Sequence, residues 1–147
     1  MLKEVLLEIY EREIEKLKNE INQYPDDEKV WLVRNEISNS AGNLALHLVG
    51  NLNHFFGAVL DENGYVRDRP SEFSRSHVPR AELVEQVEAA KDVVRSTITN
   101  LSAEALAGNY PEEFNGETVK TDFMLVSLLT HLSYHLGQIN YHRRLIG

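Results

Sequence analysis

The sequence contains no cysteine among its 147 residues. Without cysteine the chain has no disulfide framework, no thiolate to bind a metal and no thiol nucleophile. Any metal ion must therefore be held by nitrogen and oxygen donors, and any thiol chemistry must take its sulfur from a second molecule.

Clustered positive charge and long hydrophobic runs are also missing. The formal net charge is −8, and only Arg143 and Arg144 are adjacent basic residues. Nucleic-acid phosphates are bound by clustered Lys and Arg, so a nucleic-acid partner is not expected. No apolar run approaches the roughly 20 residues that span a membrane, and charges from Lys3 onward interrupt the first segment, unlike a secretion signal. We expect a soluble, cytoplasmic protein without membrane contact.

What remains is the composition of an ordinary globular domain, with 42% hydrophobic and 26% charged residues. A chain of this length buries roughly two-thirds of the surface that its unfolded form exposes. It can therefore fold around one core without a covalent or metal staple. We expect a single domain over residues 1–147.

Apolar residues recur at intervals of three and four along four segments of the chain. This period predicts helices over residues 2–24, 38–60, 79–101 and 121–145. The connections over residues 61–78 and 103–118 contain Gly and Pro and show no sustained period, and loops of this length tend to be functional. Long connections permit crossovers, so the expected fold is an all-α four-helix bundle with long crossover connections.

Three of the six histidines lie on the last predicted helix, within HLSYHLGQINYH, residues 131–142. At about 100° per residue, the side chains on one face of this helix are His131, His135, Gln138 and His142. Leucines border this face, so the imidazoles are expected to point toward the interior of the domain.

A second polar strip lies on the helix predicted over residues 38–60. His47, Asn51 and His54 fall within about 60° of one another, beside the apolar side of that helix. The two polar strips could meet inside the domain. His54 is either part of a pocket wall or exposed, and His142 either lines a pocket or serves the helix C-terminus.

Two histidines four residues apart on a helix either share a metal ion or form an ordinary core or surface pair. His131 and His135 present two neutral nitrogens on adjacent turns, and His47 is the best third ligand in the chain. Three neutral histidines leave coordination positions open for water or substrate, which is the arrangement of catalytic sites. An ion in such a site lowers the pKa of a bound water or thiol.

The residues around these histidines resemble the damage-inducible B (DinB-like) superfamily of small helical metalloproteins. The similar stretches are NSAGNLALHLVGNL, RDRPSEF and HLSYHLGQI, at residues 39–52, 67–73 and 131–139. The most specific part is His47 on the second helix together with His-x3-His-x-Gly-Gln-Ile on the last. The resemblance covers nearly the whole chain in order and spacing.

This resemblance implies a bundle with crossover topology, frequent homodimerisation and a divalent ion, usually nickel or zinc, on His47, His131 and His135. Some members of the superfamily are S-transferases or isomerases that use mycothiol or bacillithiol. For this chain it implies a metal-dependent S-transferase or hydrolase with a small-molecule substrate and a low-molecular-weight thiol as co-substrate. The alternative is a non-enzymatic stress-response dimer that binds a metal or another ligand.

Polar residues near the predicted site have two interpretations each. Gln138 either steadies a ligand or metal-bound water, or makes an ordinary amide hydrogen bond to a neighbouring helix. Arg67 and Arg69, in the connection, either close a lid by pairing with Glu72 or bind an anionic substrate.

Glycines on the predicted helices indicate close packing. Gly137 lies in mid-helix, where glycine costs roughly 1 kcal/mol relative to alanine, so we expect close approach of another helix there. Gly50 and Gly57 predict a further close contact, either inside the bundle or across a dimer.

Overall fold

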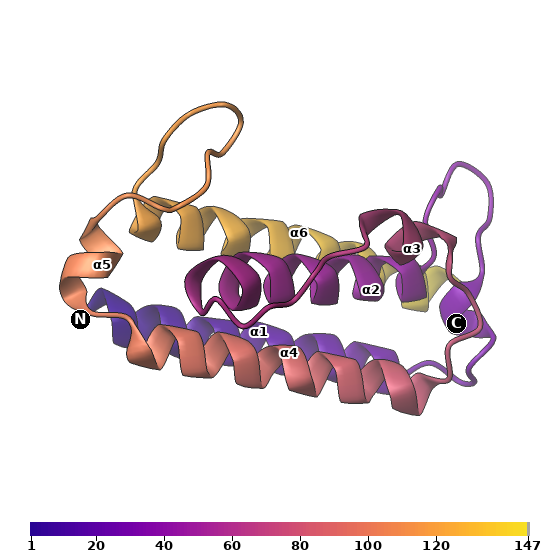
Figure 1. The fold of residues 1–147 in the computed structure, drawn as a ribbon. Coiled ribbons are helices and arrows are strands. Elements are labelled where there is room, and N and C mark those ends of the chain that lie inside the picture. Colours follow the sequence, from indigo (N-terminus) through magenta and orange to yellow (C-terminus); the bar gives the residue numbers. More distant parts are fainter. Residues whose placement is uncertain (147) are drawn as a thin grey trace.

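A computed structural model describes residues 1–146 and confirms the all-α class (Figure 1). Over this range the chain forms helices joined by loops, with isolated bridges but no β-strand. The long helices are α1 (Leu2–Asn22), α2 (Ala41–Leu52) with its π-helical continuation η2 (Asn53–Leu60), α4 (Arg80–Asn100) and α6 (Thr121–Ile146). The short ones are η1 (Lys29–Trp31), α3 (Arg69–Ser74) and α5 (Ala103–Ala107). None of the helices in this range is both long and apolar enough to cross a membrane.

The four long helices pack side by side, with α1 and α2 each in contact with both α4 and α6 (Figure 1). Helices α2 and α4 run in the same direction, so the chain must return along the length of α2 between them. Residues 61–79 make this crossover and carry α3 against α2. The connection therefore covers the side of α2 that holds the predicted metal ligand.

The core follows the predicted spacing of apolar residues on α1 and α4. Each fully buried Leu or Ile stabilises the fold by roughly 1.5–3 kcal/mol before conformational entropy is counted. Buried residues three and four apart are Leu6, Tyr10, Ile14, Leu17 and Ile21 on α1, and Leu83, Val87, Ala90, Val94 and Ile98 on α4. Tyr10 also donates its hydroxyl hydrogen to the carbonyl of Leu125, which satisfies a buried polar group and ties α1 to α6.

The second helix differs from its prediction at both ends. It begins at Ala41 rather than near Ser38, because the Ser40 hydroxyl caps it by accepting the Asn43 N–H at 3.1 Å. Beyond Leu52 the turns widen into the π-helix η2. Phe56 is the buried ring of this segment, whereas Phe55 is only partly buried.

Both long connections contain short helices that the sequence pattern did not predict. In the first, the Asp68 carboxylate caps α3 by accepting the Ser71 N–H, and Pro70 lies in the first turn. In the second, the Ser102 hydroxyl caps α5 by accepting the Ala105 N–H. Helices of five or six residues are too short to display a period, so only their caps could have indicated them.

The glycine predictions have different outcomes. A Cβ built on Gly50 would lie 1.8 Å from Glu72 Oε2, and one on Gly57 would lie 2.6 Å from Asn63 Nδ2. The close contact predicted at these glycines is therefore made inside the chain, with the crossover connection. The expectation for Gly137 is wrong, because among residues 1–146 no side chain and no neighbouring helix lies within 4 Å of its Cβ position.

Candidate metal centre

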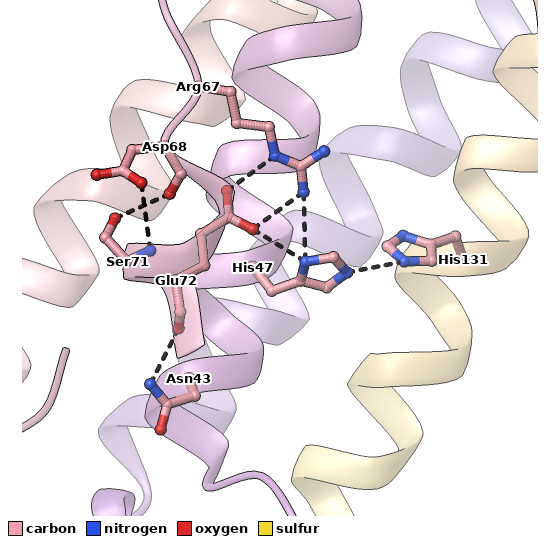
Figure 2. A network of polar contacts seen from close by, with 7 residues as sticks. All are labelled: Asn43, His47, Arg67, Asp68, Ser71, Glu72 and His131. Atoms are coloured by element: carbon pink, nitrogen blue, oxygen red, sulfur yellow. Dashed lines mark hydrogen bonds and ion pairs between the residues drawn. The ribbon is translucent and has the colours of Figure 1, made fainter. Parts of the chain in front are cut away.

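His47 on α2 and His131 and His135 on α6 converge in one group that could hold a metal ion. One ring nitrogen from each lies within 4.8 Å of the others. His47 Nε2 and His131 Nε2 are 3.1 Å apart, as Figure 2 shows for these two rings. The His135 ring centroid lies 4.6 Å from that of His131 and 5.2 Å from that of His47. The chain thus brings together the three residues that the sequence predicted as ligands.

The spacing of His47 and His131 suits a shared ion. Zinc–imidazole bonds of about 2.0–2.1 Å place two tetrahedral ligand nitrogens roughly 3.3 Å apart. The 3.1 Å between His47 Nε2 and His131 Nε2 is close to this value. The donor set is nitrogen only, which suits zinc or nickel better than magnesium or calcium.

Glu72 on α3 orients the His47 ring. Its Oε1 lies 3.0 Å from His47 Nδ1, closer than Arg67 Nη2, which lies 3.3 Å from the same nitrogen (Figure 2). Since a carboxylate only accepts, the shorter contact places the hydrogen on Nδ1 and leaves Nε2 as the donor to a metal. Arg67 holds the carboxylate by donating from Nε to Oε2 at 2.8 Å and from Nη2 to Oε1 at 3.0 Å. A carboxylate behind a histidine ligand is the usual outer support of a metal site.

The sequence indicated Glu72 only as a partner for Arg67 or Arg69 and did not indicate its contact with His47. The two residues are 25 positions apart and meet because the crossover connection lies against α2. Gly50 permits this contact, since any side chain there would occupy the space of the Glu72 carboxylate. Gly50 was thus the one residue in the sequence that could have indicated the contact between Glu72 and His47.

Gln138 gives His135 a similar support from within α6. Its Oε1 lies 2.7 Å from His135 Nδ1, so the ring donates to the amide oxygen and its Nε2 is left as the donor to a metal. Of the two interpretations of Gln138, the structure shows contact with a predicted ligand. The i, i+3 spacing on one helix is what brings these side chains together.

Burial favours the neutral form of His47 and His131. Desolvation, with smaller contributions from neighbouring His135 and His47, lowers the pKa of His131 to about 4. Burial also lowers the pKa of His47, although Glu72 opposes the shift. A metal must displace protons from histidine before it binds, so depressed pKa values favour its binding near neutral pH.

The remaining predicted histidines lie outside the group. His142 is 4% exposed, and both of its ring nitrogens are engaged: Nδ1 accepts from the Tyr24 hydroxyl at 2.6 Å and Nε2 donates to the Leu32 carbonyl at 2.8 Å. His142 therefore joins α6 to the end of α1 and to η1. His54 is partly exposed on η2, where its Nε2 lies 3.2 Å from Glu112 Oε1.

Two pockets adjoin the three-histidine group. The first, the Asn51 pocket, has a volume of about 220 Å³ and is lined by His47, His131, Asn51, Arg67, Arg69 and the ring of Phe114, among others. The second, the His135 pocket, has a volume of about 480 Å³ and includes His135, Gln138, His142, Tyr134, Tyr141 and Leu44. Both sides of the group are therefore accessible to small molecules.

These observations define a class of protein: it has an all-helical fold in which a three-histidine group lies between two pockets. The chain matches the family model described as "Protein of unknown function (DUF1572)" over residues 3–147 and belongs to that family. Comparison with curated proteins gives no significant match.

Proposed function

We propose that the protein is a DinB-like four-helix bundle that binds one divalent metal ion and acts as a metal-dependent S-transferase or hydrolase on a small molecule. His47, His131 and His135 would hold the ion, with nickel or zinc as the metal. The observation that supports this most is the convergence of three imidazoles, two of which are oriented through Nδ1 by Glu72 and Gln138.

An ion on three histidines retains open positions and lowers the pKa of a water or thiol bound there. Since the chain has no cysteine, a thiol would be a low-molecular-weight co-substrate. The Asn51 pocket and the His135 pocket give a substrate and a co-substrate separate approaches to the histidines. Burial favours the neutral form of His47 and His131, and Glu72 and Gln138 orient the rings of His47 and His135.

Metal uptake tests the first half of this proposal. Protein purified without a His tag, incubated with zinc or nickel and dialysed, should retain close to one equivalent by elemental analysis. His131→Ala should abolish uptake, whereas the control His54→Ala should leave it unchanged, because His54 pairs with Glu112 outside the group. Retention below about 0.1 equivalent in the wild type, or equal uptake by His131→Ala, would refute the site.

Activity tests the second half. The metal-loaded protein should consume an electrophile with bacillithiol or mycothiol, or hydrolyse a small ester or amide, in a reaction that stops on chelation and resumes when metal is restored. Turnover that survives chelation excludes the ion from the reaction. Full metal loading without turnover would favour the non-enzymatic alternative, in which the ion serves ligand binding or stability.

We also propose a cytoplasmic homodimer. Support comes from the outer face of α6, where large apolar side chains fall within about 100° of arc and are exposed. They are Phe123, Val126, Tyr134, Tyr141 and Leu145. Sedimentation equilibrium should give twice the chain mass, and Tyr134→Glu should shift the equilibrium toward monomer; a monomeric wild type would contradict the dimer.

A further inference from the structure

The Asn51 pocket differs in charge from the rest of the molecule. The chain carries a formal net charge of −8, yet no Asp or Glu lines this pocket, whereas Arg67 and Arg69 both do. Low-dielectric walls of one sign of charge concentrate oppositely charged solutes. The local field of the pocket therefore favours a negatively charged molecule, against the net charge of the protein.

Only one of the two arginines is available to such a molecule. Arg67 is committed to Glu72 through two hydrogen bonds, and its charge is balanced by that carboxylate. Arg69 follows the N-cap of α3 and is exposed, and the structure of residues 1–146 gives it no ion pair. A guanidinium with free donors can bind a carboxylate or phosphate through two parallel hydrogen bonds.

A second observation also indicates a ligand. Asn51 is 6% exposed and lines the pocket one turn beyond His47, and its side-chain oxygen has no hydrogen-bond partner within residues 1–146. A buried polar atom without a partner costs about 1–3 kcal/mol, so such atoms are uncommon outside functional sites. The Asn51 oxygen is an acceptor that a ligand O–H or N–H would satisfy.

Most of the remaining lining is apolar. Phe55, Phe114 and Leu128 line the pocket, together with Ser127. Its volume of about 220 Å³ is below the roughly 300–1,000 Å³ of pockets for drug-sized molecules. The pocket therefore suits a compact metabolite with an apolar or aromatic part.

We infer that the Asn51 pocket binds a small organic acid that also carries a hydrogen-bond donor, with its acid group on Arg69 and its O–H or N–H on Asn51. The apolar part of this molecule lies against Phe55 and Phe114. This assignment deepens the proposed function, because His47 and His131 line the same pocket and the acid would be the substrate.

Three related probes test each contact by isothermal titration calorimetry. They are 4-hydroxyphenylacetate, phenylacetate without the hydroxyl, and 4-hydroxyphenylacetamide without the charge. The hydroxy acid should bind most tightly, and each of the other two should bind about tenfold more weakly. Equal binding of the acid and the amide, or no binding of the hydroxy acid, would overturn the inference.

Matched variants assign the contacts. Arg69→Gln should lower the affinity for the hydroxy acid about tenfold. Arg34→Gln removes the same charge from an exposed loop position outside the pocket and should leave this affinity within about twofold of the wild-type value. Asn51→Leu should remove the preference for the hydroxyl while the melting temperature is unchanged or higher, because an unsatisfied polar group is lost from the interior. A lower melting temperature with the preference intact would show Asn51 to be structural.

Titrations of metal-free and zinc-loaded protein separate this inference from the proposed function. If the chain takes up no zinc but still binds the acid through Arg69, the metal proposal fails and the pocket assignment stands. If zinc binds and the acid does not, the pocket assignment fails and the metal site stands.

Discussion

Glu72 is the residue that most changes the chemistry expected of His47. Its carboxylate is 5% exposed, is neutralised by Arg67 and fixes the hydrogen of His47 on Nδ1. An imidazole without such a partner would distribute its hydrogen between both nitrogens and rotate more freely. The sequence predicted the three histidines because their types and spacing carry the chemistry, but the carboxylate support arises only when the crossover folds onto α2.

Replacing Glu72 by Gln should therefore weaken zinc binding. The change removes the charge but preserves the shape, and losses of outer-shell partners typically reduce metal affinity 10–100-fold. A competition titration against a chromophoric chelator measures the effect. Glu112→Gln, which removes the carboxylate next to His54, is the matched control and should leave the affinity unchanged. Zinc affinity of Glu72→Gln within about twofold of wild type would show that Glu72 does not support the site.

His142 should make stability depend on pH. Burial lowers its pKa below the ordinary 6.5, opposed by its hydrogen bond to the Leu32 carbonyl. As pH falls through about 6.5 the unfolded chain gains a proton that the folded chain resists, so the free energy of unfolding decreases toward acid pH. Between pH 7 and 5, His142→Gln should reduce this slope by up to about 1.4 kcal/mol per pH unit in urea titrations of metal-free protein. An unchanged slope would mean that His142 titrates normally when folded.

At the scale of elements, the long helices were predictable and their irregular parts were not. The spacing of apolar residues predicted the ends of α1, α4 and α6 to within a few residues, because helices of about twenty residues repeat their apolar stripe several times. The π-helical η2 and the six-residue α3 lack that redundancy. Helix η2 packs against α4, and Asn63 and Val93 lie close to Gly57.

Two mid-helix glycines should respond in opposite directions to alanine. Gly50→Ala would place a methyl group on the Glu72 carboxylate, so α3 must shift, and we expect a loss of roughly 1–3 kcal/mol in stability together with weaker zinc binding. Gly137→Ala has free space around it and should stabilise by up to about 1 kcal/mol through helix propensity. Chemical denaturation of both variants measures the difference; a neutral Gly50→Ala would show that α3 does not depend on this contact.

At the scale of the whole molecule, the three-histidine group joins helices that are far apart in the chain. His47 and His131 are 84 positions apart and come from α2 and α6, so the site exists only in the folded protein. The sequence could predict the ligands but not which pocket each would face, since that depends on how the helices are rotated in the assembled fold. For the same reason Arg67 and Arg69, two positions apart in one motif, differ: Arg67 pairs with Glu72, whereas Arg69 makes no ion pair within residues 1–146.

Zinc should stabilise the folded protein through this link. Free metal at about 100 times its dissociation constant adds roughly 2.7 kcal/mol to the free energy of unfolding, a shift of several degrees in melting temperature for a chain of this size. Differential scanning calorimetry should show this shift in the wild type and in His54→Ala, and none in His131→Ala. A shift of equal size in His131→Ala would place the stabilising ion elsewhere.

X-ray absorption spectroscopy of the zinc-loaded protein examines the metal's coordination directly. We expect three imidazole nitrogens at about 2.0–2.1 Å from the zinc ion, with the remaining coordination positions filled by water or added ligand. His135→Ala should then lower the imidazole count to two. A shell made of carboxylate oxygens, or one that retains three imidazoles in His135→Ala, would contradict a shared ion on His47, His131 and His135.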